Sequence, residues 1–253
     1  MIVLRSIVMA FSLFTVIPMP QVEWSERNMR YMMAAFPAVG VVVGLLVLGW
    51  WQLCEMLGFG VLARAAGVGL VPVVVTGGIH LDGFADVVDA LSSHAEPERK
   101  RQIMKDPHVG AFAIIGVCSY LIAYVALASE VGEAHLLSLA CMPIISRCLS
   151  SFATVTFKKA SKTGMLAAEG TTDGASVILG IVLGICTTIG ALLIVLDGVV
   201  GGSVVAAAVA VLLYVRRLAE REFGGMGGDL AGYYLQLAEL VMLAAIVVVG
   251  RLV

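Results

Sequence analysis

AAFPAVGVVVGLLVLGWWQLCEML, residues 34–57, decides the fold, because this run holds a single charged residue, Glu55. A helix needs about 20 mostly apolar residues to cross the hydrocarbon core of a bilayer. The sequence repeats such runs at 61–80, 110–130, 134–156, 175–196, 199–218 and 230–250. The pattern predicts an all-α, polytopic transmembrane helix bundle with seven spans in the lipid bilayer.

The composition excludes an ordinary soluble domain. Apolar residues make up 60% of the 253 residues and charged residues only 13%, against about 25% charged residues in typical soluble domains. The longest polar stretch, about 82–108, is too short for a separate soluble domain, so we expect one integral membrane catalytic domain over 1–253. No basic tract points to nucleic acid as a partner. The five cysteines stand in apolar stretches without a metal-binding spacing and read as packing residues.

The N-terminal run 2–17 is apolar but shorter than the other seven, and it ends at the helix-breaking Pro18-Met19-Pro20. It lacks the small-x-small pattern of a cleavage site, so we expect a retained helix rather than a signal peptide. Three placements stay open for this element: it spans the membrane, re-enters it or lies at the interface.

Basic residues set the predicted orientation. Of the 16 Lys and Arg residues, 12 fall in loops on the side that precedes the 34–57 span, whereas the opposite side has only Arg64 and Arg251. The twelve are Arg27, Arg30, Arg99, Lys100, Arg101, Lys105, Lys158, Lys159, Lys162, Arg216, Arg217 and Arg221. Loops rich in Lys and Arg stay in the cytoplasm. We therefore expect a cytoplasmic (inner) membrane protein whose active site faces the cytoplasm.

Three carboxylates share one face of the helix expected at 76–91. Asp82, Asp86 and Asp89 fall within an arc of about 60° on a helix that turns about 100° per residue. No Lys or Arg stands three or four residues from any of them, so a group from outside this helix must neutralise the charge. Mg²⁺ or Mn²⁺ suits such an all-oxygen site and keeps coordination positions for substrate phosphates. A remote arginine such as Arg147 is the alternative.

Glycines flank the first carboxylate and recur near the C-terminus. Gly77-Gly78 precedes Asp82 with the spacing Gly-Gly-x-x-x-Asp, and Gly224-Gly225 precedes Asp229 with the same spacing. Glycine lets a backbone approach another backbone or a ligand closely. We predict that Asp229 joins the metal site as a fourth carboxylate. The candidate phosphate-binding glycines are Gly77, Gly78, Gly224, Gly225 and Gly228.

Three further polar residues are candidates for the site. Lys105 introduces the 110–130 span and either grips phosphate or marks a cytoplasmic helix end. Arg147 lies inside an apolar run, where a charge is costly and faces a polar partner or substrate. His80 precedes the acidic face and is a metal neighbour, a base or an interfacial histidine.

Paired glycines within the spans predict close helix packing. Gly40 and Gly44 stand four residues apart in one span, and Gly180 and Gly184 do so in another. Such small-xxx-small pairs let neighbouring membrane helices approach closely.

The chain resembles the adenosylcobinamide-GDP ribazoletransferase (cobalamin synthase) family along nearly its whole length. The stretch Thr76-Gly77-Gly78-Ile79-His80-Leu81-Asp82-Gly83-Phe84-Ala85-Asp86, continued to Asp89, is similar to the signature of that family. Further similar segments follow the same order: 14–18, 36–44, 103–112 and 224–229. The sequence departs from the family pattern at Val16, Pro107-His108 and Gly227.

The resemblance implies the last step in assembling the nucleotide loop of cobalamin. In that reaction α-ribazole, or its 5′-phosphate, displaces GMP from adenosylcobinamide-GDP. Metal held by Asp82, Asp86, Asp89 and Asp229 would bridge the pyrophosphate, and Asp89 or His80 would take the hydroxyl proton. The sequence leaves open the number of metal ions, whether ribazole carries the 5′-phosphate, and whether the chain forms a homo-oligomer.

Two other functions share part of this pattern. A CDP-alcohol phosphatidyltransferase-like enzyme also uses helix-borne aspartates, and the chain has Asp82-Gly83-Phe84-Ala85. However, Asp86 replaces the arginine that usually follows, and a later Gly-x-x-x-Asp-x-x-x-Asp is absent. A cation-coupled transporter would place carboxylates at the bilayer midplane, whereas these carboxylates gather at one membrane edge.

Overall fold

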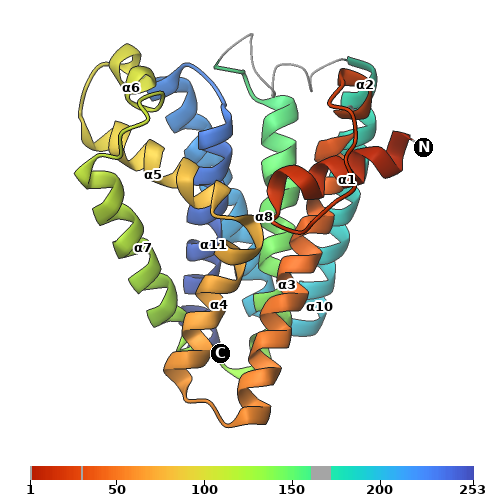
Figure 1. Cartoon of the computed structure of the whole chain (residues 1–253). Helices are drawn as coiled ribbons and strands as arrows, with labels where there is room; N and C mark the ends of the chain where they lie inside the picture. Colours follow the sequence, from red (N-terminus) through yellow and green to blue (C-terminus); the bar gives the residue numbers. More distant parts are fainter. Residues whose placement is uncertain (1, 30, 161–171) are drawn as a thin grey trace.

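The computed structural model describes residues 2–29, 31–160 and 172–253 and is a bundle of helices without a strand in those residues (Figure 1). Arg30 and Lys162, two of the basic residues counted above, lie outside the described part. The elements are α1 (Ile2–Phe14), α2 (Glu26–Met29), α3 (Met32–Leu57), α4 (Val61–Thr76), α5 (Ile79–Ser92), α6 (Pro97–Ile103), α7 (Ala111–Ala128), η1 (Glu133–His135), α8 (Leu136–Thr156), α10 (Thr172–Leu218), η2 (Ala219–Phe223) and α11 (Gly228–Gly250). The all-α bundle predicted from the apolar runs is confirmed.

Helices α3 and α8 pack closely at the centre of the bundle because two glycines face α8. A Cβ at Gly40 would stand 2.8 Å from the Cα of Ile144, and one at Gly44 would stand 3.1 Å from the carbonyl carbon of Ala140. The prediction for this glycine pair is confirmed. Within the described residues it is wrong for Gly180 and Gly184, whose Cβ positions would meet no other part of the chain within 4 Å.

The 47 residues of α10 form two antiparallel arms rather than one rod. Gly198 breaks the helix with φ 55° and ψ −127°. A Cβ at Gly190 would stand 3.4 Å from the side chain of Val205, although a straight helix would separate these residues by about 22 Å. The chain therefore reverses at Gly198, where the sequence predicts the break between the spans 175–196 and 199–218.

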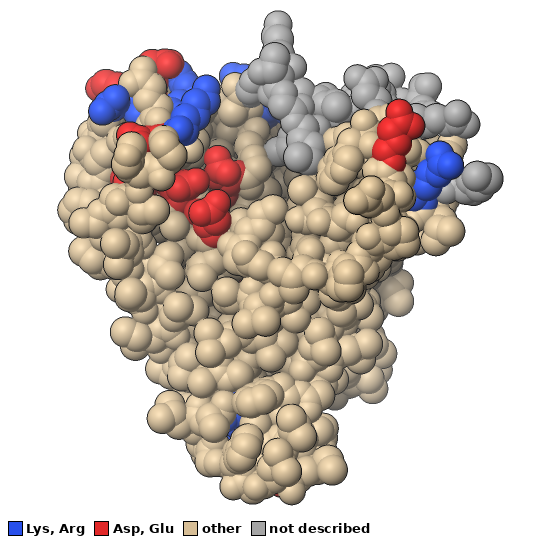
Figure 2. All heavy atoms as spheres, in the orientation of Figure 1, with Lys and Arg blue, Asp and Glu red and all other residues tan. Residues whose placement is uncertain are grey.

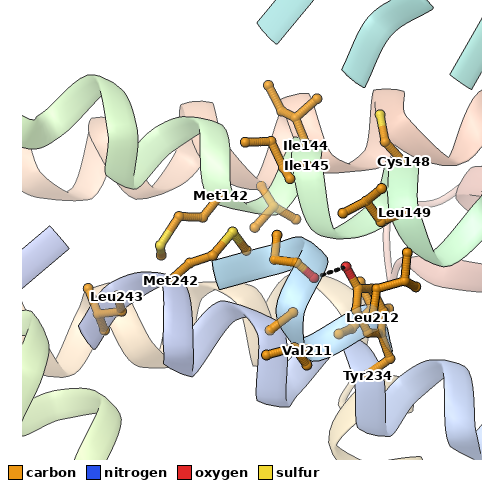
Figure 3. Close-up of a cluster of buried hydrophobic side chains, with 14 of the residues drawn as sticks. Met142, Ile144, Ile145, Cys148, Leu149, Val211, Leu212, Tyr234, Met242 and Leu243 are labelled. Atoms are coloured by element: carbon orange, nitrogen blue, oxygen red, sulfur yellow. Dashed lines mark hydrogen bonds between the residues drawn. The ribbon is translucent and has the colours of Figure 1, made fainter. Parts of the chain in front are cut away.

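Apolar side chains from α8, α10 and α11 fill the core between those helices (Figure 3). Met142, Ile145 and Cys148 of α8 are buried against Val211 of α10 and Met242 of α11. The hydroxyl of Tyr234 donates a hydrogen bond of 3.5 Å to the carbonyl of Ala208. Tight packing of this kind holds membrane helices together, because lipid tails are as apolar as the side chains themselves.

A sharp bend separates α4 from α5. The two helices meet at 98°, and both connecting glycines have left-handed backbones, with φ 63° at Gly77 and φ 78° at Gly78. The predicted span 61–80 is therefore wrong at its end, because α4 stops at Thr76. Helix α5 instead lies across one end of the bundle (Figure 1).

Helix α1 also runs across the bundle rather than along it (Figure 1). Its 13 residues reach about 20 Å, less than the hydrocarbon thickness of about 30 Å. The backbone amide of Val16 donates a hydrogen bond of 2.9 Å to the carbonyl of Val75, so the segment after α1 is tied to the end of α4. Of the three predicted placements, the orientation and length favour the interface.

Charged side chains gather at the end of the bundle that carries α5, α6 and η2, while the face below shows almost no charged side chains (Figure 2). We call this the charged end. In the part of the chain that the structure describes, five helices are long and apolar enough to cross a membrane, or six if α4 and α5 form one bent span. The protein is thus a multi-pass membrane protein, and the count of seven spans stays a prediction.

Candidate active site

Helix α5 carries the acidic face at the charged end, as predicted. It begins at Ile79 directly after Gly78, and Asp82 falls in its first turn. Asp82 is exposed, and Asp86 and Asp89 are half-buried. Carboxylate side chains gather over α5 in the space-filling view (Figure 2).

Helix α11 crosses α5 at a pair of glycines, and this crossing brings in Asp229. A Cβ at Gly83 would stand 2.9 Å from both the Cα and the carbonyl oxygen of Asp229. From the other side, a Cβ at Gly232 would stand 2.9 Å from the carbonyl oxygen of His80. The absence of side chains at Gly83 and Gly232 lets the two backbones touch. The crossing therefore joins the two Gly-Gly-x-x-x-Asp stretches in space.

The carboxylates interact unfavourably with one another. Burial, and then the negative charges of Asp82, Asp229 and Asp89, raise the pKa of Asp86 to about 6. None of these four carboxylates has a hydrogen bond or an ion pair with a described residue. Their charge is therefore unbalanced within the described chain, which is the electrostatic condition for binding a cation.

The four carboxylates do not form a closed metal cage. Within residues 2–29, 31–160 and 172–253, no group of three or more His, Cys, Asp or Glu side chains is placed to hold a metal ion. Asp89 turns toward the start of α7, since its carboxylate occupies the place that a Cβ at Gly110 would take. The remaining donors, Asp82, Asp86 and Asp229, still fit an ion that takes one or two carboxylates and completes its shell with water and phosphate, as Mg²⁺ does.

His80 lies beneath the acidic face rather than on it. It is 4% exposed and contacts two aromatic rings, stacking on Phe14 at 5.8 Å and tilting against Phe36 at 5.6 Å between centroids. Burial, and then the charge of Arg147, lower the pKa of His80 well below its ordinary value. The imidazole is therefore neutral, and its Nε2 has no hydrogen-bond partner among the described residues.

Arg147 is paired inside the bundle. It is 1% exposed, and its guanidinium forms an ion pair with Glu239, which is 2% exposed. It also donates to the carbonyl of Pro143 at 3.2 Å. Arg147 thus does not neutralise the aspartates, and the alternative explanation of their charge is wrong for this arginine. Phosphate binding by Arg147 stays a prediction without support from its position.

The sequence reasoning missed Glu239. The available signal was a carboxylate in the apolar run 230–250, since a buried charge in a membrane span needs a partner. Ser146 also belongs to this cluster, because its hydroxyl donates to Glu239 at 2.8 Å. Arg147, Glu239 and Ser146 form a polar layer under the site. In this layer one buried positive charge pairs with one buried negative charge.

The C-terminal glycines have different surroundings. A Cβ at Gly225 would stand 2.5 Å from the carbonyl oxygen of Lys158, and the amide of Met226 donates to that oxygen at 2.7 Å. The close approach predicted for Gly225 is therefore to another backbone segment. A Cβ at Gly224, whose φ is 80°, would stand 3.4 Å from Arg101. Gly228, in contrast, has open space beside it.

Helix α6 is fixed to η2 next to these glycines. Lys100 forms an ion pair with Glu222, and Arg101 donates to the carbonyl of Phe223 at 3.4 Å. Lys105 follows α6 and is exposed. A ligand from solution could therefore contact the side chain of Lys105. Its role in phosphate binding stays a prediction.

Two hollows border Asp82. The first is a cavity of about 200 Å³ under the acidic face, between α1, α3, α5, α8 and α11, and it is also bordered by Asp229, His80 and Ser150. The second is a more open hollow of about 370 Å³, bordered by Gly77 and Gly78. Asp82 therefore stands where two molecules could approach one carboxylate from different sides.

Comparison with known proteins shows the family to which the chain belongs. The model of the cobalamin-5-phosphate synthase family matches residues 6–247. The adenosylcobinamide-GDP ribazoletransferase of Lachnoclostridium phytofermentans is 36% identical over 97% of this chain and 94% of the relative. Relatives with the same name are 35% identical in Clostridium botulinum strain Alaska E43, over 94% of each chain, and 31% identical in Geobacillus thermodenitrificans, over 92% of each. No solved structure gives a significant match. The chain belongs to the cobalamin-5-phosphate synthase family.

Proposed function

We propose that this protein joins adenosylcobinamide-GDP to ribazole, giving adenosylcobalamin and GMP. The observation that carries the reaction is the family match over residues 6–247, together with relatives that bear the name of this transferase over more than nine-tenths of the chain. The CDP-alcohol phosphatidyltransferase and the cation-coupled transporter are not favoured, because neither accounts for that match.

In the reaction, a ribose hydroxyl of ribazole attacks the phosphorus next to cobinamide. The new bond joins that oxygen to phosphorus, the bond from phosphorus to the bridging oxygen breaks, and GMP leaves with the bond electrons. Such phosphoryl transfer depends mainly on positioning and charge neutralisation. The chain must therefore hold two substrates against one another and accept one proton from the hydroxyl.

The acidic face would bind the ion that neutralises the diphosphate. One or two of Asp82, Asp86 and Asp229, with water and phosphate oxygens completing the shell, would hold Mg²⁺ or Mn²⁺, supported by their unbalanced charge and all-oxygen chemistry. When bound, such an ion withdraws charge from the phosphate oxygens and stabilises the leaving group. Gly77 and Gly78, which border the open hollow next to Asp82, provide backbone that approaches the diphosphate without side chains.

We propose that His80, rather than Asp89, accepts the proton of the attacking ribose hydroxyl. His80 borders the same cavity as Asp82 and Asp229, and its Nε2 has no hydrogen-bond partner among the described residues. Asp89 faces the start of α7 instead. We further place the charged end in the cytoplasm, supported by its excess of basic residues.

Purified protein in liposomes, supplied with adenosylcobinamide-GDP, α-ribazole and Mg²⁺, tests the reaction. We expect adenosylcobalamin and GMP in equal amounts, and Asp82→Ala should abolish both products while inserting into the membrane normally. Release of CMP from a CDP-alcohol without any cobalamin would refute the proposal. α-Ribazole 5′-phosphate, offered in parallel, identifies which acceptor is preferred. A reporter fused after residue 95 should respond on the cytoplasmic side.

A further inference from the structure

The cavity beneath the acidic face is lined mainly by apolar side chains. Phe14, Phe36, Met33 and Leu235 line it, while Asp82 and Asp229 border it as well. The rings of Phe14 and Phe36 lie 4.2 Å apart between centroids, and both contact His80. The cavity is thus an aromatic and aliphatic space next to two carboxylates of the proposed reaction centre.

A hydroxyl in this cavity wall has no partner. Ser150 is fully buried, and its Oγ has no hydrogen bond to any described residue. Its neighbours differ, since Ser146 donates to Glu239 at 2.8 Å and Ser151 donates to the carbonyl of Met33 at 2.8 Å. A buried hydroxyl without a partner costs free energy unless another molecule supplies one. Ser150 therefore points to a ligand with a hydrogen-bonding atom among apolar surroundings.

We propose that this cavity receives the benzimidazole ring of ribazole, with the hydroxyl of Ser150 donating a hydrogen bond to the unsubstituted ring nitrogen. The inference rests on the proposed function and specifies which hollow takes which substrate. The ring would lie among Phe14, Phe36 and His80, since aromatic rings prefer stacked or tilted contacts with one another. The ribose would then reach toward Asp82 and the Nε2 of His80.

The size and polarity of the cavity favour this ring over the other parts of the substrates. A cavity of about 150 Å³ holds one benzene, so about 200 Å³ suits one small fused ring and is too small for a corrin. Guanine is also bicyclic, but its edge carries a carbonyl, a ring N–H and an amino group. The two carboxylates at the border, Asp82 and Asp229, are those assigned to the metal, so most of those groups would lack partners among Phe14, Phe36 and Leu235. Benzimidazole attached to ribose has a single unsubstituted nitrogen, which matches the one hydroxyl of the described lining that has no partner.

The test combines a variant with a substrate analogue. Ser150→Ala is compared with the wild type, using α-ribazole and an analogue in which CH replaces the unsubstituted ring nitrogen. Steady-state GMP release gives KM for each acceptor and for adenosylcobinamide-GDP. We expect Ser150→Ala to raise KM for α-ribazole about tenfold, the usual effect of one lost hydrogen bond, with KM for adenosylcobinamide-GDP unchanged. With the wild type, KM for the analogue should be about tenfold above KM for α-ribazole. With Ser150→Ala, the two values of KM should be equal, because the variant and the analogue each remove the same hydrogen bond.

Matched controls separate binding from folding. Ser151→Ala removes the neighbouring hydroxyl, which does not border the cavity, and should leave KM for α-ribazole unchanged. Ser150→Ala breaks no hydrogen bond made by its side chain and should keep its thermal stability. Phe14→Ala, which removes part of the aromatic wall, should also raise KM for α-ribazole selectively. An unchanged KM in Ser150→Ala, an equal rise for both substrates, or additive effects of variant and analogue would overturn the assignment. A wild type that makes no adenosylcobalamin would instead overturn the proposed function itself.

Discussion

Replacing Gly83 with alanine should push α11 away from α5 and so move Asp229 away from Asp82 and Asp86. The added Cβ would stand 2.9 Å from the Cα and the carbonyl oxygen of Asp229. Both are backbone atoms that cannot rotate aside, so the helices must move. Reaching the 3.4 Å at which ordinary contact begins requires a displacement of about 0.5 Å.

The displacement affects activity more than stability. A misplacement of about 1 Å can cost about 100-fold in rate, so about 0.5 Å should lower kcat about tenfold. For stability, alanine gains about 1 kcal/mol over glycine in a helix, while overpacking costs about 1–3 kcal/mol. The two effects leave a net destabilisation of about 0–2 kcal/mol.

The assay is GMP release by purified protein in liposomes, with thermal unfolding measured on the same samples. Gly184→Ala is the matched control, because a Cβ at Gly184 has no heavy atom within 4 Å. It should keep full kcat and show the stability gain of alanine in a helix. If Gly83→Ala matched Gly184→Ala in both measurements, the close crossing of α5 and α11 would not position the carboxylates, and the reasoning would be refuted.

Two further predictions concern charge. Glu239→Ala should destabilise the protein by about 3–5 kcal/mol in thermal unfolding, because it leaves Arg147 buried without its partner. Replacing both residues with methionine should restore most of that stability. A double variant as unstable as Glu239→Ala would contradict the pairing. Binding of Mn²⁺ should weaken as the pH falls through about 6, because mutual repulsion and burial raise the pKa of Asp86 to about 6 and a protonated carboxylate competes poorly for metal. Titration calorimetry between pH 5 and 8 measures this, and Asp86→Asn should remove the inflection.

Much of the fold follows from hydropathy. The run 34–57 corresponds to α3, and the break between the runs 175–196 and 199–218 coincides with the reversal at Gly198. The bend after Thr76 was not predicted, because apolar residues continue into Ile79 and hydropathy does not distinguish a helix that turns from one that proceeds. The two glycines with left-handed φ determine the turn, and their effect depends on backbone conformation rather than on apolarity.

The site was predictable where its residues share one helix. Helical periodicity placed Asp82 and Asp86 together, since both positions lie on one element. The approach of Asp229 was suggested only by the repeated Gly-Gly-x-x-x-Asp spacing, and the crossing at Gly83 and Gly232 provides its physical cause. The ion pair between Arg147 and Glu239 was missed for the opposite reason. Partners 92 residues apart on different helices leave no periodic signal, so only their shared need for a counter-charge pointed to the pair.

The two groups of charges in this protein differ in how they are balanced, and the difference locates the chemistry. Inside the bundle, Arg147 and Glu239 neutralise one another and hold α8 against α11. At the charged end, Asp82, Asp86 and Asp229 repel one another without a described partner. A carboxylate cluster of this kind is costly for folding, and an ion pair or an apolar residue would be more stable there. Under the proposed function, a bound cation and diphosphate would compensate this cost, and we therefore propose the unpaired carboxylates as the reaction centre and the paired charges as the scaffold beneath it.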